Sequence, residues 1–186
     1  MDVDKLILKA KKNELNKKEI EYIKNKALEE NNDLYHYLYM LGISKKYEYE
    51  YIFEKHLKNY EKPEIIKISL QTLCRFWNKT DKYINYVLEY YKQNDWDDFG
   101  DTRLMAISIL GDYLHTKKKL DDQDKLVIKN LLINFNNADN DETLRRSCYE
   151  ALVSASGKNI YTVELFEKQF NVDKKVIEWA TDLCKN

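Results

Sequence analysis

Four segments of the chain repeat one spacing of small and apolar residues, and this internal repeat limits the possible folds more than any other feature. In each segment, a starting residue is followed three, six and seven positions later by a small or apolar side chain. The segments are Leu34–Gly42, Ile66–Cys74, Thr102–Gly111 and Leu144–Leu152. Their anchors, Leu38, Leu70, Ala106 and Cys148, are separated by 32, 36 and 42 residues. Because these spacings mark one face of an α-helix, they predict helices that recur at the period of a helix pair.

The first segment alone is also typical of a β-strand, because large rings alternate with other side chains from Tyr35 to Tyr39. Its register with the three other segments predicts a helix instead. With one proline and four glycines in 186 residues, the chain has few of the residues that form the tight turns of β-hairpins. The chain is therefore predicted to be all-α. Candidate N-caps of the repeated helices are Asp33 (or Asn32), Asp101 and Asp141.

Each repeated segment is followed by a second amphipathic stretch, which predicts that the helices come in pairs. The second stretches begin at Tyr47, Asp81, Asp124 and Ile160. The N-terminal residues 1–30 add two less similar helices, and a C-terminal helix places Ala180 at 32 residues after Cys148. One pair cannot cover its own apolar stripe, so neighbouring pairs are expected to stack.

This pattern resembles the HEAT-repeat family of α-solenoids. The resemblance is carried by Asp101, Arg103, Ala106 and Ile109–Gly111, and more weakly by Glu142, Arg145, Cys148 and Ala151–Leu152. It implies a short right-handed α-solenoid of about five helix pairs, forming one domain over residues 1–186. Residues 31–186 would hold the recognisable repeats and residues 1–30 divergent capping helices. The second helix of each pair would line the concave face.

Composition and charge exclude several classes of protein. The chain is 44% hydrophobic and 34% charged, with 31 basic against 32 acidic residues, and it has no apolar run of the length that a bilayer crossing needs. A nucleic-acid binder usually has a clear basic excess, which is missing here. The first residues lack the features of a secretory signal. We therefore expect a cytoplasmic protein that binds neither nucleic acid nor membranes.

No constellation of residues predicts catalysis or a cofactor. The three histidines, His36, His56 and His115, belong to no known catalytic motif, and the four glycines are scattered where helices are predicted to end. Cys74, Cys148 and Cys184 are too far apart in the sequence for a CxxC metal site and are expected to be small buried thiols. No catalytic residue, metal or cofactor is predicted.

The distribution of charge among the loops is uneven. The loops between helix pairs are Asn59–Glu64, Asn94–Asp101 and Asn136–Glu142, and they hold nine acidic residues against the single Lys62. The loops within pairs are rich in lysine. In a solenoid these two sets follow opposite edges, so one edge is predicted to be acidic and the other mixed to basic. Helix capping explains part of this pattern, but both sets of loops join a C-terminus to an N-terminus.

Aromatic residues accompany this acidic edge. Trp96 and Phe99 stand among four aspartates, a composition typical of an interface anchor, although Trp96 packing beneath its own helices is an equal alternative. Tyrosines crowd the second helices beside glutamates, and core packing accounts for about half of them. The predicted partner-binding residues are Asp95, Trp96, Asp97, Asp98, Phe99 and Asp101 in the second acidic loop, Glu48, Tyr51, Tyr86 and Glu89 on the second helices, and Asp139 and Asp141 in the third acidic loop.

These features favour a non-enzymatic protein-binding module with a basic protein partner. By architecture, size and surface chemistry, the chain is similar to the HEAT-type immunity proteins of bacterial toxin systems, including contact-dependent growth inhibition. That resemblance implies a toxin domain as the partner, most simply a nuclease whose basic cleft the acidic side chains would block. Two alternatives remain open: an enzyme similar to HEAT-like DNA glycosylases, whose concave face should be basic, and a scaffold subunit of a larger assembly.

Overall fold

The computed structural model describes residues 1–92, 94–158 and 172–185, and the secondary structure of these residues is helical without any strand. The all-α prediction is confirmed, and the Tyr35–Tyr39 segment lies in a helix. The α-helices are α1 (Val3–Lys11), α2 (Lys17–Leu28), α3 (Leu34–Ile43), α4 (Glu50–His56), α5 (Pro63–Gln71), α6 (Thr80–Tyr90), α7 (Asp101–Thr116), α8 (Asp122–Asn136), α9 (Glu142–Ala155) and α10 (Lys174–Leu183). A 3-10 turn (Tyr47–Tyr49) precedes α4, and a π-helical turn (Thr72–Phe76) continues α5. The second helix predicted from Ile160 lies outside the described residues.

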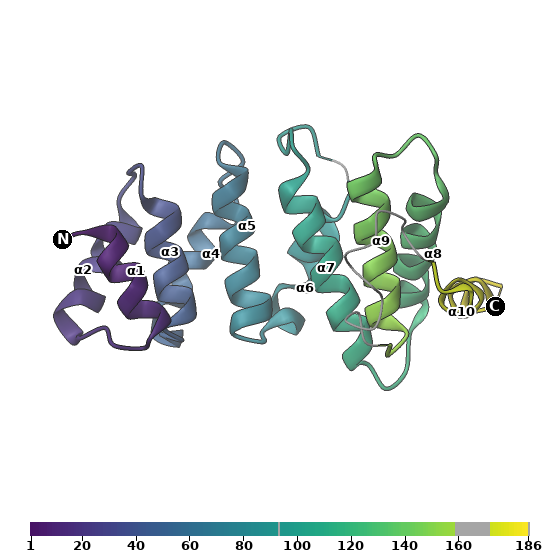
Figure 1. Cartoon of the computed structure of the whole chain (residues 1–186), viewed down its shortest axis with the longest axis horizontal. Coiled ribbons are helices and arrows are strands. Elements are labelled where there is room, and N and C mark those ends of the chain that lie inside the picture. The colour runs from purple at the N-terminus through teal and green to yellow at the C-terminus, as the bar shows by residue number, and fades with distance from the viewer. Residues whose placement is uncertain (93, 159–171, 186) are drawn as a thin grey trace. The chain divides into compact units, whose positions relative to one another are not determined.

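The chain divides into two compact units, unit 1 (Met1–Met105) and unit 2 (Ala106–Asn186), and the boundary falls inside α7. Within unit 1, α3 packs against α1, α2 and α5, and α4 packs against α5. Figure 1 shows α1, α3 and α5 side by side in one layer, with α2, α4 and α6 behind them. The first and second helices of the predicted pairs therefore lie in different layers of unit 1.

The core of unit 1 is built on the predicted anchors and on one tryptophan. Leu38 and Leu70 are both fully buried. The indole of Trp77 lies edge-on to Phe53 at 5.0 Å between ring centroids, and its Nε1–H donates to the Gly42 carbonyl at 2.9 Å. Trp77 thereby ties the end of α5 and its π-helical turn to the end of α3.

Unit 2 is held together by the close packing of small residues. The anchors Ala106, Cys148 and Ala180 are all fully buried. A β-carbon added at Gly111 would lie only 2.6 Å from the Cα of Ala151, so α7 and α9 approach closely at this glycine. Helix α8 packs against α9, and α10 packs against both.

The N-termini of the repeated helices agree with the sequence only in part. Asp141 is the N-cap of α9 and accepts from the Leu144 amide at 2.9 Å, as predicted. Asp33 occupies the N-cap position of α3 without a side-chain capping bond. Asp101 is not an N-cap, because it is already the first residue of α7. The first amides of that helix bond instead to Asp97, which precedes the helix by four residues.

Two of the three cysteines match the expectation of buried thiols. Cys74 and Cys148 are buried, whereas Cys184 follows α10 and is partly exposed. Burial raises the pKa of the Cys74 thiol to about 12. Cys74 is therefore protonated at neutral pH and behaves as a small apolar side chain.

Candidate protein-binding surface

Two of the acidic loops lie side by side in unit 1. The ring centroids of Tyr60, in the loop Asn59–Glu64, and Trp96, in the loop Asn94–Asp101, are 5.2 Å apart. The hydroxyl of Thr102, which directly follows the second loop, donates to the Pro63 carbonyl at 3.1 Å. The predicted gathering of these two loops is confirmed. The third acidic loop, Asn136–Glu142, belongs to unit 2 and is described separately.

A row of four aromatic rings runs from α6 to these loops. Successive ring centroids are 5.9 Å apart for Tyr86 and Tyr90, 5.5 Å for Tyr90 and Trp96, and 5.2 Å for Trp96 and Tyr60. Tyr90 is fully buried, Tyr86 and Trp96 are half-buried, and Tyr60 is exposed. The row therefore has one buried ring, Tyr90, with half-buried or exposed rings on both sides of it.

Tyr90 is the buried ring of this aromatic row, and a hydrogen bond holds it in place. Its hydroxyl donates to the Leu57 carbonyl. Burial raises the pKa of Tyr90 strongly, and the neighbouring Tyr60 and Glu89 raise it further. The phenol consequently stays protonated and keeps its hydrogen bond over the whole physiological pH range.

Asp97 holds the second acidic loop in place. Its carboxylate accepts from the backbone amides of Thr102 at 3.3 Å and Arg103 at 2.9 Å, which are among the first amides of α7. The Gly100 amide donates to the Asp97 carbonyl at 2.8 Å, and Gly100 has a φ of +68°. Asp97 is only 8% exposed. It was predicted as a partner-binding residue, but its carboxylate is occupied in fixing the loop.

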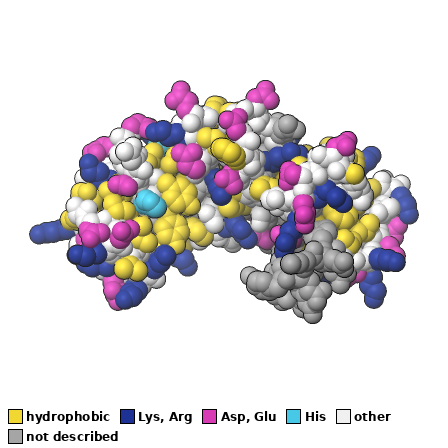
Figure 2. Space-filling view, turned by 45° about the horizontal axis from the view of Figure 1, so that its top comes forward, with side chains coloured by type: hydrophobic (Ala, Val, Ile, Leu, Met, Phe, Trp, Pro, Cys, Tyr) yellow, Lys and Arg dark blue, Asp and Glu magenta, His cyan; other side chains and the backbone are white. Residues whose placement is uncertain are grey.

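The other side chains of this loop face outward. Phe99 is 92% exposed, and Asp95 and Asp98 are both exposed. Asp101 is exposed as well, but it forms an ion pair with Lys67 at 3.1 Å. Trp96 lies between the two alternatives that the sequence left open, because it is half-buried against Tyr60 and Tyr90 and keeps part of its ring accessible. Acidic side chains with hydrophobic ones between them are visible along the upper edge of the view in Figure 2.

Three residues join this region that were not among the predicted partner-binding residues. Tyr60, Glu61 and Glu64 are exposed and lie in the neighbouring loop or the first turn of α5. The signal was present in NYEKPE, where an aromatic residue stands beside acids as it does in NDWDDFGD. We define the acidic-aromatic surface as Tyr60, Glu61, Glu64, Tyr86, Glu89, Asp95, Trp96, Asp98 and Phe99.

Four carboxylates of this surface are not held in ion pairs with any described residue, although Lys62 lies near enough to Glu61 and Glu64 to interact with them electrostatically. Among the described residues, Glu61, Glu64, Asp95 and Asp98 form no ion pair, and Lys62 in the same loop is paired with Glu30. These four carboxylates are exposed. The acidic-aromatic surface is therefore negative as well as aromatic.

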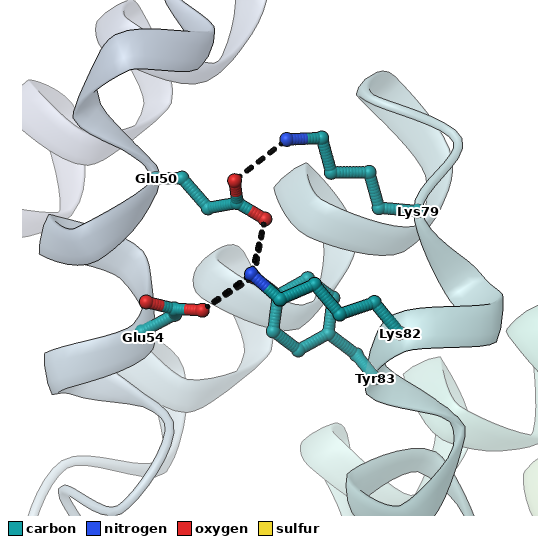
Figure 3. A network of polar contacts seen from close by, with 5 residues as sticks. All are labelled: Glu50, Glu54, Lys79, Lys82 and Tyr83. Atoms are coloured by element: carbon teal, nitrogen blue, oxygen red, sulfur yellow. Dashed lines mark hydrogen bonds and ion pairs between the residues drawn. The ribbon is translucent and has the colours of Figure 1, made fainter.

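The face formed by α4 and α6 has a different character, because its acids are paired. Lys79 donates to Glu50 at 2.7 Å, and Lys82 bridges Glu50 at 3.1 Å and Glu54 at 2.9 Å (Figure 3). The Tyr83 hydroxyl donates to both carboxylates. This network joins the two helices, and in it the carboxylates of Glu50 and Glu54 are locally balanced by lysines.

The predicted tyrosines of this face are partly core, as the sequence suggested. Tyr83 and Tyr90 are buried, while Tyr47 is 47% and Tyr51 is 50% exposed. Glu48, before α4, and Glu89, near the end of α6, are exposed. The predicted residues Glu48 and Tyr51 lie in the Tyr47–His56 segment. Tyr86 belongs to the aromatic row, and Glu89 is adjacent to Tyr90 in α6.

The Glu50 network predicts a pH-dependent contribution to stability. Burial alone would raise the pKa of Glu50, but hydrogen bonds from Lys79, Tyr83 and Lys82 outweigh it and lower the pKa from 4.5 to about 2. A lowered pKa stabilises the fold above pH 4.5, and this stabilisation is lost as the pH falls toward 2. We expect Glu50→Gln to lower the free energy of unfolding by about 1–3 kcal/mol at pH 7, by about half as much at pH 3, and by little at pH 2.

Urea denaturation of both proteins at several pH values measures this difference. Glu48→Gln is the matched control, because Glu48 is exposed and forms no ion pair with any described residue, so its effect should be small at every pH. A Glu50→Gln deficit that stays constant from pH 7 to pH 3 would contradict the assignment.

The two predicted residues of the third acidic loop lie in unit 2. Asp139 and Asp141 are exposed in the connection between α8 and α9. Asp141 caps α9, and the Asp139 amide donates to the Asn137 side chain at 3.1 Å. Their part in partner binding stays a prediction.

The described ranges contain no group of three or more His, Cys, Asp or Glu side chains arranged to hold a metal ion. Within the same ranges, no helix has the combined length and apolarity that a membrane crossing needs. Comparison of the chain with protein-family models, curated proteins and solved structures finds no match.

Proposed function

We propose that this chain is a non-enzymatic protein-binding module that engages a basic protein partner through the acidic-aromatic surface of unit 1. The observation that carries the proposal is the aromatic row from Tyr86 to Tyr60, edged by exposed carboxylates that form no ion pair within the described part of the chain. Large rings supply contact area at low entropic cost, and carboxylates supply attraction for arginine and lysine.

The chemistry of this surface favours a basic partner over an acidic or neutral one. Glu61, Glu64, Asp95 and Asp98 would each have to be desolvated against a neutral partner without compensation. A basic partner compensates them, and its attraction to the negative surface also speeds association. Affinity should therefore fall as the salt concentration rises.

Two finer features complete the proposal. The helix pairs would stack as a short right-handed HEAT-like solenoid, with which the two layers of unit 1 are compatible. The partner would be a toxin domain, most simply a nuclease, so that the chain acts as an immunity protein in the cytoplasm. A basic cleft that binds phosphates is a suitable target for clustered carboxylates. A scaffold role in a larger assembly would use the same surface for a different partner.

The proposal is tested by capturing and identifying the partner with the tagged chain in its native organism, followed by binding measurements on the purified pair. We expect Asp98→Lys to raise the Kd at least about tenfold, because it places a cation opposite a basic partner. Glu14→Lys is the matched control: Glu14 is exposed between α1 and α2, and the same charge change there should leave the Kd within about twofold.

Equal effects of the two substitutions would contradict a binding role for the acidic-aromatic surface. Inhibition of the partner's nuclease activity by the wild-type chain would support the immunity role, and a partner without toxicity would favour the scaffold. Tight binding of the chain to duplex DNA at physiological salt would contradict the proposal and favour the glycosylase-like alternative.

A further inference from the structure

Phe99 contributes almost nothing to the fold, although it is a large apolar residue. Its exposed fraction of 92% is the highest among the large hydrophobic side chains of the described residues. A phenyl ring in this position gains no burial from folding and keeps its apolar surface in water. Folding therefore gives no reason for an aromatic residue at position 99.

The loop that carries Phe99 is anchored on both sides of it. Before Phe99, the Trp96 ring packs against Tyr60 and Tyr90, and the Asp97 carboxylate binds the first amides of α7. After it, the Gly100 amide closes a turn onto the Asp97 carbonyl. An exposed ring on a held loop loses little conformational entropy on binding, which is the condition for an effective interface anchor.

The surroundings of Phe99 specify the chemistry of what receives it. Asp95 and Asp98 are exposed in the same loop and form no ion pair with any described residue. Inserting the ring brings both carboxylates to the mouth of whatever cavity accepts it. That mouth must offer cations, because an apolar rim would leave two charges desolvated and unpaired.

We infer that Phe99 inserts into an apolar pocket of the partner whose rim carries arginine or lysine side chains that pair with Asp95 and Asp98. This inference rests on the proposed function and adds to it the shape of the partner's site: a pocket of phenyl size within a basic surface. The Phe99 ring supplies apolar burial at the centre of the contact, and the two carboxylates supply its polar surround.

A second copy of this chain is a poor occupant of the same contact. In a two-fold dimer through Phe99, Asp95 and Asp98 of one copy would face the same residues of the other. Like charges facing each other are destabilising.

Site-specific photo-crosslinking in the native organism tests the inference directly. Phe99→p-benzoylphenylalanine places a photoreactive ring at the tip of the loop, and Tyr51→p-benzoylphenylalanine places the same group on the half-exposed Tyr51 of α4. We expect the first variant to crosslink to apolar residues that are flanked by arginine or lysine in the partner's structure, with a yield at least about tenfold above that of the second.

The possible outcomes separate this inference from the proposed function. A crosslink from position 51 but not from 99 would overturn the anchor and leave a protein-binding module. A crosslink from 99 to a second copy of the chain, or to an acidic or flat surface, would also overturn the inference. No crosslink from either position, together with no captured partner, would overturn the proposed function itself.

Affinity measurements on the identified pair provide the second readout. Phe99→Ala should raise the Kd about tenfold to a hundredfold, whereas Phe99→Leu, which still fills an apolar pocket, should raise it only a few fold. Neither substitution should change the melting temperature, because the ring makes no buried contact. An unchanged Kd for Phe99→Ala would overturn the inference while leaving the effect of Asp98→Lys in place.

Discussion

Replacing Trp77 by alanine is expected to destabilise the protein by about 3–5 kcal/mol, the usual cost of removing a buried tryptophan. Trp77 is only 5% exposed and contacts the rings of Phe53 and Tyr47 at centroid distances of 5.0 and 5.2 Å. Its indole N–H also satisfies the Gly42 carbonyl. The substitution therefore leaves a cavity and an unpaired carbonyl in the same place, and both cost free energy.

Urea denaturation followed by circular dichroism measures the loss. Trp77→Phe keeps most of the apolar volume but removes the N–H donor, so we expect an intermediate loss of about 1–3 kcal/mol. Phe76→Ala is the matched control, because Phe76 is the neighbouring aromatic residue and is only half-buried. A Trp77→Ala protein as stable as the Phe76→Ala protein would show that the indole is not the link between α3 and α5.

The sequence predicted the helical core well because helical periodicity reports burial directly. The four repeat anchors, Leu38, Leu70, Ala106 and Cys148, are each fully buried. A residue that recurs on one helix face must be covered by a neighbouring helix, whatever the rest of the chain does. This is why the helix over the Tyr35 segment could be preferred to a strand.

Features that depend on close approach between helices could not be predicted in this way. Gly111 was expected at a helix end but lies inside α7, and Gly42, which does lie in the last turn of α3, is also at a close contact. A β-carbon at Gly42 would lie 2.5 Å from the hydroxyl oxygen of Thr72, the first residue of the π-helical turn. Among the described residues, that hydroxyl is buried without a hydrogen-bond partner. Periodicity carries no information about such local widening of a helix.

The candidate surface was predicted in composition but not in the roles of individual residues. Exposure of Phe99 follows from its position in a strongly polar loop, and the meeting of the two acidic loops follows from pairing helices in register. The pairing of Glu50 and Glu54 with Lys79, just before α6, and Lys82, in its first turn, was missed, because it requires the register between two helices. Likewise, the sequence gives no means to separate Asp97 from Asp98, since loop conformation alone decides which carboxylate points inward.

The different roles of Asp97 and Asp98 can be tested by making the same charge change at each position. The change at Asp97 should reduce stability, whereas the change at Asp98 should reduce partner binding. Asp97→Lys removes the acceptor of the Thr102 and Arg103 amides and places a cation in a nearly buried site at the positive end of α7. We expect it to lower the free energy of unfolding by about 3 kcal/mol or more. Asp98→Lys changes an exposed side chain and should alter stability by less than about 0.5 kcal/mol.

In partner binding, Asp98→Lys should be the variant with a specific defect. Asp98→Lys is expected to weaken binding while the protein remains fully folded. Asp97→Asn is the conservative substitution at position 97. Its side-chain oxygen still accepts from one amide, so this variant should keep most of the stability that Asp97→Lys loses and should retain binding. Denaturation and binding measured on all three variants would refute the division of roles if Asp98→Lys unfolded the protein or if Asp97→Lys left its stability unchanged. A buried carboxylate that shapes the loop and an exposed one that the loop presents are thus distinguishable by experiment, although the two residues are neighbours of identical chemistry.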